Sequence, residues 1–160
     1  MPLRLSNWSF PRGCQKNKPP GLSMQIFTLA REVISCEEAA SEKCIPLENE
    51  LKTLVLETSV GLLALHLRGD KRASLRSVKR FLPTEQAHIA SEKCLGSMGL
   101  VPGTVCPVLE PIWSLPHLIS AGVLKLDFVS TNNGTRRNYL RFSPAVMLSA
   151  TDIRIGEFEV

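Results

Sequence analysis

A chain of 160 residues, 44% hydrophobic and 21% charged, has the composition of an ordinary soluble globular protein of one domain. Charged residues, glycine or proline interrupt each apolar run well before the roughly 20 residues of a membrane-spanning helix, so we expect no membrane partner. The net charge of +4 comes from residues 1–23, because four basic and no acidic residues lie there. The remaining chain is neutral, which excludes a globally basic nucleic-acid-binding protein.

Residues 1–23 are predicted to form an irregular, basic leader. Prolines and glycines are too dense in this segment for a helix or an interior strand. An added or misassigned leader ahead of Met24, a transit peptide and a cationic nucleic-acid-binding arm are three open interpretations. Residues 24–160, where the regular pattern starts, are predicted to form a single domain.

The five cysteines show neither a CxxC pair nor the Cys and His spacing of a zinc site, so we expect no metal and no cofactor. An odd count without a secretory signal indicates reduced thiols and a cytoplasmic location. Cys106 is a candidate nucleophile, although none of the three histidines can be assigned to it from the sequence.

The first regular elements are a short strand and a helix. The strand is expected within Gln25–Ile34, and Ser35 is the candidate N-cap of the helix that follows. Glu37 and Glu38 lie in its first turn, where the helix dipole favours acidic side chains, so they fit helix chemistry better than a catalytic pair. Pro46 is expected to end this helix.

The central prediction is a β-hairpin over Leu51–Leu67, with a break at 58–61. Apolar residues occupy both faces of its first half, which is typical of an interior strand. Lys52 shares a face with two leucines. It either lays its stem on apolar surface with the ammonium in water, or serves as a fixed cation for an anionic or carbonyl group of a ligand.

A turn at 69–72 precedes a second helix, which Ser74 is expected to cap and Pro83 to end. Leu75, Val78 and Leu82 fall on one face of this helix. Its outer face is basic, which indicates either a solvated surface or a patch for a phosphate backbone. The basic residues are Arg72, Arg76, Lys79 and Arg80.

Three further elements are predicted after Pro83. A brief strand is expected within Gln86–Ala90, and Ser91 is expected to cap a short helix. The stretch 99–108 then has two glycines and two prolines, which predict a tight loop with Gly103 and Pro107 spaced as GxxxP. Such a loop can turn backbone N–H groups towards a ligand oxygen, although Gly- and Pro-rich loops are common.

The last third of the chain is expected to contain a polar, arginine-rich loop, Phe128–Asn138, between two strands. This loop is either the rim of a ligand site or an exposed hairpin. Leu140 and Phe142 resume an alternating pattern, and Ser143 with Pro144 is expected to open a last helix.

In this order, the motifs EEAA, LKTLVL, GDKR, MGLVPGTVCP, VSTNNG and FSP resemble the YbaK-type aminoacyl-tRNA editing domain over residues 24–148. That family includes free-standing deacylases and the editing insertion of bacterial prolyl-tRNA synthetases. The resemblance implies an α+β fold, in which short helices surround a mixed, barrel-like curled β-sheet. It also implies a pocket that hydrolyses a mischarged aminoacyl-tRNA, with an aminoacyl-tRNA synthetase as a second candidate partner.

Carried over by position, Lys52 matches the family's essential lysine, and Gly103 with Pro107 matches its GxxxP loop. The resemblance implies that Lys52 positions the substrate, while the Gly103 loop stabilises the oxyanion and orients water. The implied substrate-binding residues are Thr53, Thr104, Pro107, Ser130, Thr131 and Asn132.

Two departures from the family pattern leave a second class of function open. Asn132 and Asn133 replace a common Gly-Gly or Thr-Gly pair, and the usual acidic residue is not evident near Asn138 and Tyr139. A catalytically inactive tRNA- or synthetase-binding module of the same fold is therefore the alternative to a trans-editing deacylase. An unrelated small-ligand protein is the third hypothesis.

Overall fold

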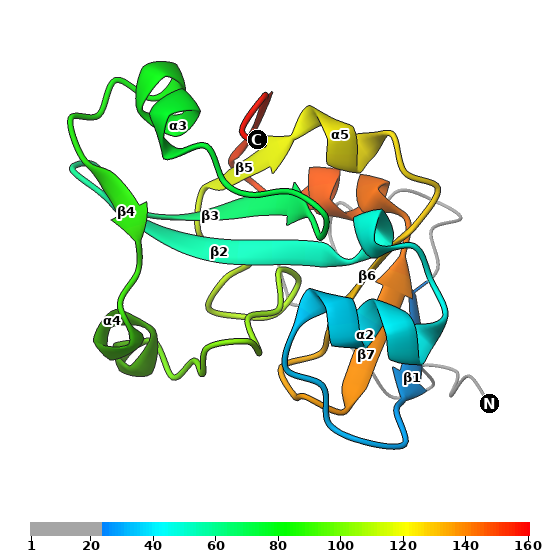
Figure 1. Cartoon of the computed structure of the whole chain (residues 1–160). Helices are drawn as coiled ribbons and strands as arrows, with labels where there is room; N and C mark the ends of the chain where they lie inside the picture. Colours follow the sequence, from blue (N-terminus) through cyan, green and yellow to red (C-terminus); the bar gives the residue numbers. More distant parts are fainter. Residues whose placement is uncertain (1–23) are drawn as a thin grey trace.

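The computed structural model describes residues 24–160, so the predicted leader, residues 1–23, lies outside the described residues. The described chain forms a mixed α+β fold, with two sheets and short helices packed around them (Figure 1). The two sheets do not close into a barrel, and the expected barrel-like curl is not confirmed.

The larger sheet is built around the predicted hairpin. Strand β2 (Leu51–Thr58) pairs antiparallel with β3 (Gly61–Arg68). Gly61, at the tight turn between them, has a φ of 121°, which favours glycine. Strand β4 (Ala87–Ile89) pairs with β2, which confirms β2 as an interior strand. Two parallel strands complete the order β4-β2-β3-β5-β8; they are β5 (His117–Ser120) and β8 (Ile153–Gly156).

The smaller sheet has the order β1-β7-β6, and all its pairs are antiparallel. Its strands are β1 (Met24–Thr28), β7 (Asn138–Phe142) and β6 (Val129–Asn132). A single parallel bridge between Glu50 and Ser130 joins the start of β2 to β6. The two sheets therefore meet where β2 begins.

Helix α2 (Cys36–Lys43) begins as predicted, because the Ser35 hydroxyl accepts a hydrogen bond from the Glu38 N–H at 3.1 Å. It ends earlier than predicted. Cys44 adopts the left-handed conformation, with φ 54°, two residues before Pro46, and Pro46 instead caps the 3₁₀ helix η1 (Leu47–Asn49).

The remaining helices are short, and serine caps begin three of them. Ser74 caps α3 (Leu75–Phe81) and Ser91 caps α4 (Glu92–Ser97), both as predicted. The predicted last helix is the 3₁₀ helix η2 (Pro144–Ser149), and α5 (Ala121–Leu124) was not predicted.

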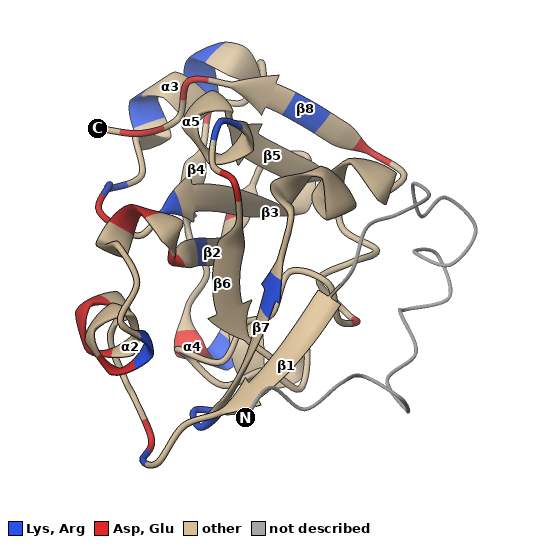
Figure 2. Ribbon diagram, turned by 90° about the vertical axis from the view of Figure 1, so that its right-hand side faces the viewer, with Lys and Arg blue, Asp and Glu red and all other residues tan. Residues whose placement is uncertain are grey.

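No helix in residues 24–160 is both long and apolar enough to cross a membrane. The basic outer residues of α3 are exposed, and Figure 2 shows the blue bands on this helix.

One predicted loop is partly wrong. Residues 129–132 of the expected loop Phe128–Asn138 form strand β6, and only residues 133–137 connect it to β7. Ser130 and Thr131 are buried, and β6 has β7 along one edge and a bridge to Glu50 on the other. Tertiary context has therefore overridden the weak strand propensity of small polar residues such as Ser130 and Asn132.

The hairpin supplies apolar residues to both faces of the larger sheet. On one face, Leu56 packs with Val78 of α3 and with Phe158. On the other face, Val55 packs with Val105 and Ile112 of the loops that follow α4. Because successive side chains of a strand alternate, Lys52 and Thr53 at the start of β2 are directed to opposite faces of the sheet.

Candidate functional site

A cavity of about 290 Å³ lies where the two sheets and α2 meet. Its wall combines the β1–α2 connection, one face of α2, the start of β2, the loop after α4, and the β6–β7 hairpin. The residues that contribute most to the chemistry of this wall are Cys36, Lys43, Glu50, Lys52, Thr53, Gly103, Val105, Thr131, Asn132 and Tyr139.

Helix α2 presents one face to the cavity, since Cys36, Ala39 and Lys43 lie three and four residues apart. Two hydrogen bonds hold the connection before it against the β6–β7 loop. The Leu29 N–H donates to the Arg137 carbonyl at 2.8 Å, and the Arg137 side chain donates back to the Leu29 carbonyl at 2.9 Å. These bonds hold together two parts of the cavity wall that lie about a hundred residues apart in the sequence.

A buried ion pair forms part of the cavity wall. The Lys43 ammonium lies 2.7 Å from Glu50 Oε1, and the two side chains are only 2% and 5% exposed. The same ammonium donates to the Ser130 hydroxyl at 2.9 Å and lies 4.3 Å from the centroid of the Tyr139 ring. Lys43 therefore links α2, β2, β6 and β7 through one charged group.

Burial perturbs both members of this pair. Desolvation lowers the pKa of Lys43, against the attraction of Glu50, and desolvation raises the pKa of Glu50, against the attraction of Lys43. Glu50 Oε2 has no hydrogen-bond partner among residues 24–160. This pair has no local signal in the sequence, because its members lie seven positions apart with a 3₁₀ helix between them.

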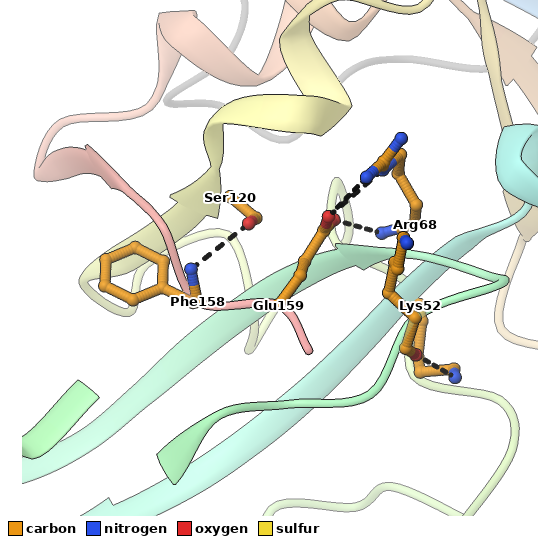
Figure 3. A network of polar contacts seen from close by, with 6 residues as sticks. Lys52, Arg68, Ser120, Phe158 and Glu159 are labelled. Atoms are coloured by element: carbon orange, nitrogen blue, oxygen red, sulfur yellow. Dashed lines mark hydrogen bonds and ion pairs between the residues drawn. The ribbon is translucent and has the colours of Figure 1, made fainter. Parts of the chain in front are cut away.

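Lys52 is also a lining residue, although its side chain leaves β2 on the face opposite to Thr53, and its ammonium is held differently from that of Lys43. It donates one hydrogen bond, at 2.8 Å, to the backbone carbonyl of Lys71 in the turn after β3 (Figure 3). That turn is fixed in place because Arg72 exchanges two backbone hydrogen bonds of 2.9 Å with Val160. An ammonium has three N–H donors, so Lys52 can bind a ligand oxygen while it keeps this contact.

The C-terminal segment supports the same turn. Arg68 donates two side-chain hydrogen bonds to Glu159 Oε2, at 2.9 and 3.0 Å, and its backbone N–H donates to Oε1 at 2.9 Å (Figure 3). The Phe158 N–H donates to the Ser120 hydroxyl. These contacts hold the last residues against β3 and β5, and thereby hold the partner carbonyl of Lys52.

The predicted GxxxP loop reaches the cavity through Gly103 and Val105. Gly103 has a φ of 82°, which favours glycine at this position. Within residues 24–160, neither the Gly103 N–H nor the Val105 N–H donates a hydrogen bond. Thr104 and Pro107 do not line the cavity; the Thr104 hydroxyl donates to the Val101 carbonyl instead.

The three predicted residues of β6 have different surroundings. Ser130 lies behind the wall, where it accepts the bond from Lys43. Thr131 lines the cavity, and its buried hydroxyl has no hydrogen-bond partner among the described residues. Asn132 lines the cavity too, but its amide donates to the Val105 carbonyl at 3.3 Å and accepts from the Gly134 N–H at 2.8 Å. Asn132 thus braces the GxxxP loop against the β6–β7 hairpin.

The cysteine chemistry considered from the sequence is not supported by the structure. Cys106 is buried and does not line the cavity, and burial raises the pKa of its thiol to about 12. A thiol with that pKa is not a thiolate nucleophile near pH 7. Burial also raises the pKa of Cys36, which does line the cavity. Within residues 24–160, no three His, Cys, Asp or Glu side chains gather as at a metal site.

Comparison with known protein families gives this cavity its context. The family model of the aminoacyl-tRNA editing domain matches residues 30–149, which is well over half of the chain. The chain belongs to the aminoacyl-tRNA editing domain family. The matched range of this editing domain contains each element of the cavity wall except Leu29.

Solved structures agree with this fold at low sequence identity. A candidate trans-editing enzyme for prolyl-tRNA synthetase superposes with a TM-score of 0.78 at 19% identity, over 95% of this chain and 99% of that one. A crystallised hypothetical protein has the same TM-score at 22% identity, over 88% and 93% of the two chains. A candidate signal transduction protein from Marinobacter aquaeolei VT8 has a TM-score of 0.64 at 17% identity, and the match covers 92% of this chain but 29% of that longer one. No curated protein sequence is significantly similar to this chain.

Proposed function

We propose that this editing domain is a cytoplasmic, trans-acting aminoacyl-tRNA deacylase, which hydrolyses the ester of a mischarged tRNA. The observation that carries the proposal is one cavity, in a member of the editing family, whose lining residues include Lys52, Gly103 and Val105. Within residues 24–160 the Lys52 ammonium donates one hydrogen bond, and the Gly103 and Val105 N–H groups donate none. These are the groups that ester hydrolysis needs for substrate binding and for oxyanion stabilisation.

An aminoacyl ester is already activated, so the protein has to position water and stabilise the developing oxyanion. In our proposal Lys52 binds the terminal nucleotide or the substrate carbonyl. The Gly103 and Val105 N–H groups bind the carbonyl oxygen as it becomes negative. Neither step uses a protein nucleophile, which agrees with the raised pKa of Cys36, the cysteine that lines the cavity.

Thr53, Thr131 and Asn132 are proposed to contact the substrate or to shape its pocket, because they line the same cavity. Ser130 is proposed to act indirectly, through Lys43. Thr104 and Pro107 are proposed to support the loop, because neither lines the cavity. The proposed partner is a mischarged tRNA, and an aminoacyl-tRNA synthetase that charges it is a further candidate.

The experiment is deacylation of tRNAs carrying Ala, Cys, Ser or Thr, by the wild type, Lys52→Ala and Lys71→Ala. The last variant is a matched control, because Lys52 bonds to the backbone carbonyl of Lys71 and not to its side chain. We expect one ester to be hydrolysed by the wild type and Lys71→Ala, and spared by Lys52→Ala. Binding of tRNA without hydrolysis of any ester would instead indicate the non-catalytic tRNA-binding module.

A further inference from the structure

A chain of hydrogen bonds runs from the cavity wall into the larger sheet. The Thr53 hydroxyl lies 3.0 Å from His66 Nδ1, His66 Nε2 lies 2.8 Å from His117 Nδ1, and His117 Nε2 lies 3.0 Å from the Trp113 carbonyl oxygen. The two rings stack with centroids 5.0 Å apart. Thr53 lines the cavity, whereas His66 and His117 are buried behind it on β3 and β5.

The inner end of this chain determines the direction of each bond. A carbonyl oxygen only accepts, so His117 must carry its proton on Nε2, and in the neutral ring its Nδ1 is then an acceptor. His66 must therefore donate from Nε2, which leaves its Nδ1 as an acceptor. The Thr53 hydroxyl must donate to that nitrogen. All three donors thus point away from the cavity.

Both rings are neutral near pH 7. Burial lowers the pKa of His66 well below 6.5, and the neighbouring His117 lowers it further. Burial is also the main cause of the lowered pKa of His117, against the Trp113 carbonyl, Asp152 and Glu110, which raise it. An added proton would make both nitrogens of His66 donors and would break the bond that Thr53 donates.

The Thr53 hydroxyl proton is therefore used in the hydrogen bond to His66 and cannot be donated to a ligand in the cavity. Thr53 can offer the cavity only lone pairs, so it accepts hydrogen bonds and does not donate them. Glu50, in the same wall, is the anionic acceptor that suits a cationic group such as an ammonium. The neutral Thr53 acceptor suits a neutral O–H donor.

We infer that His66 is a positioning residue, which fixes Thr53 as the hydrogen-bond acceptor for an O–H group of the bound ester complex. This inference rests on the proposed deacylase function. The O–H group belongs either to the attacking water or to the free hydroxyl of the terminal ribose, and both have the same donor chemistry.

The first test is the proton position itself. We expect ¹⁵N NMR of the wild type at pH 7.5 to show His66 and His117 both neutral and protonated on Nε2. Protonation of His66 on Nδ1 would overturn the inference, because Thr53 would then be free to donate into the cavity. This measurement needs no substrate, so it separates failure of the inference from failure of the proposed function.

The second test is a double-mutant cycle on deacylation, with Thr53→Val and His66→Phe. We expect each single variant to lower kcat by about tenfold, the effect of one hydrogen bond, and the double variant to be no slower than Thr53→Val alone. Thr53→Ser and His66→Asn, which retain the hydroxyl and an acceptor at the Nδ1 position, should recover most of the activity.

An equal loss from His66→Phe with and without the Thr53 hydroxyl would overturn the inference, because it would show that His66 acts only through the fold. A tRNA whose terminal adenosine lacks the 2′-hydroxyl identifies the donor. Thr53→Val should cost nothing extra on this substrate if the ribose donates, and the full tenfold if water does. If the wild type hydrolyses no ester, the proposed function fails while the NMR result still decides the direction of the bonds.

Discussion

Two lysines in the same cavity wall are held in opposite ways. Lys43 is 2% exposed, and its ammonium is surrounded by a carboxylate, a hydroxyl and an aromatic ring. Lys52 is half-buried and makes one hydrogen bond to a backbone carbonyl. The difference indicates two roles. Lys43 has a structural role, because its ammonium contacts groups from several elements. We propose a ligand-binding role for Lys52, because two of its three N–H donors have no partner among the described residues.

The largest expected effect comes from removing the enclosed lysine. Lys43→Met leaves the Glu50 carboxylate buried without its counter-charge, which typically costs about 3–5 kcal/mol of stability. Urea denaturation should therefore show a lower free energy of unfolding. The matched variant Lys43→Met with Glu50→Gln removes both charges and should recover part of the loss. An unchanged midpoint in Lys43→Met would contradict the structural role of this lysine.

The next effect separates activity from stability at the other lysine. Lys52→Ala should lower the rate of ester hydrolysis by about 10²-fold, the loss usual for one donor to a transition-state oxygen. Its free energy of unfolding should fall by only about 1 kcal/mol, because a single neutral-acceptor hydrogen bond is lost. Single-turnover kinetics and urea denaturation measure the two quantities. Comparable losses of activity and stability would show that Lys52 is structural, like Lys43.

The buried histidines provide a second comparison with Lys43. Burial lowers the pKa of both histidines and favours their neutral form, whereas buried Lys43 is paired with the Glu50 carboxylate. The pKa of His66 is lowered on folding, so between pH 6.5 and that lower value the unfolded chain binds a proton that the folded protein does not. Stability is therefore complete above pH 6.5 and decreases below it, by up to about 1.4 kcal/mol per pH unit for each histidine.

The measurement is urea denaturation of the wild type and His66→Phe at pH 7.5, 6.5 and 5.5. We expect a shallower decline of the free energy of unfolding in the variant than in the wild type. Equal slopes in the wild type and His66→Phe would disprove the assignment.

The smallest effect is expected at an exposed ion pair. Arg154 lies 3.9 Å from Asp152, and both side chains are more than half exposed. Solvent screens such a pair, so Arg154→Gln should change the free energy of unfolding by less than about 1 kcal/mol. A loss as large as that of Lys43→Met would show that burial does not explain the difference between the pairs.

Local signals predicted the parts of the fold that depend on neighbouring residues. The hairpin of β2 and β3, its interior position and the serine caps of α2, α3 and α4 follow from alternation and capping, and the structure confirms them. The Val129–Asn132 strand was missed because its small polar residues read as a loop. Strands β5 and β8 were also not predicted, because nothing in their short sequences indicates parallel pairing with β3.

The candidate site could be predicted only where a motif carried it. Lys52 and Gly103 were singled out from the residue pattern and then from the family resemblance, and Thr53, Thr131 and Asn132 from the resemblance. The fold brings all five to one cavity, and their roles stay predictions. The partners of Lys43 and of His66 could not be found in this way, because each contact joins strands or helices whose neighbourhood only the topology decides. The pKa shifts of Lys43 and His66 are caused mainly by burial, and burial cannot be read from a single sequence.

The pairing of β1 with β7 has a consequence for how the protein is made. Thr28 and Asn138 are partners across 110 residues, so a long chain must be closed before the smaller sheet can form. The hairpin of β2 and β3 has no such delay, and we expect it to form first. During synthesis the cavity wall stays incomplete until Asn138–Phe142 have left the ribosome. A partly synthesised chain therefore lacks the complete cavity.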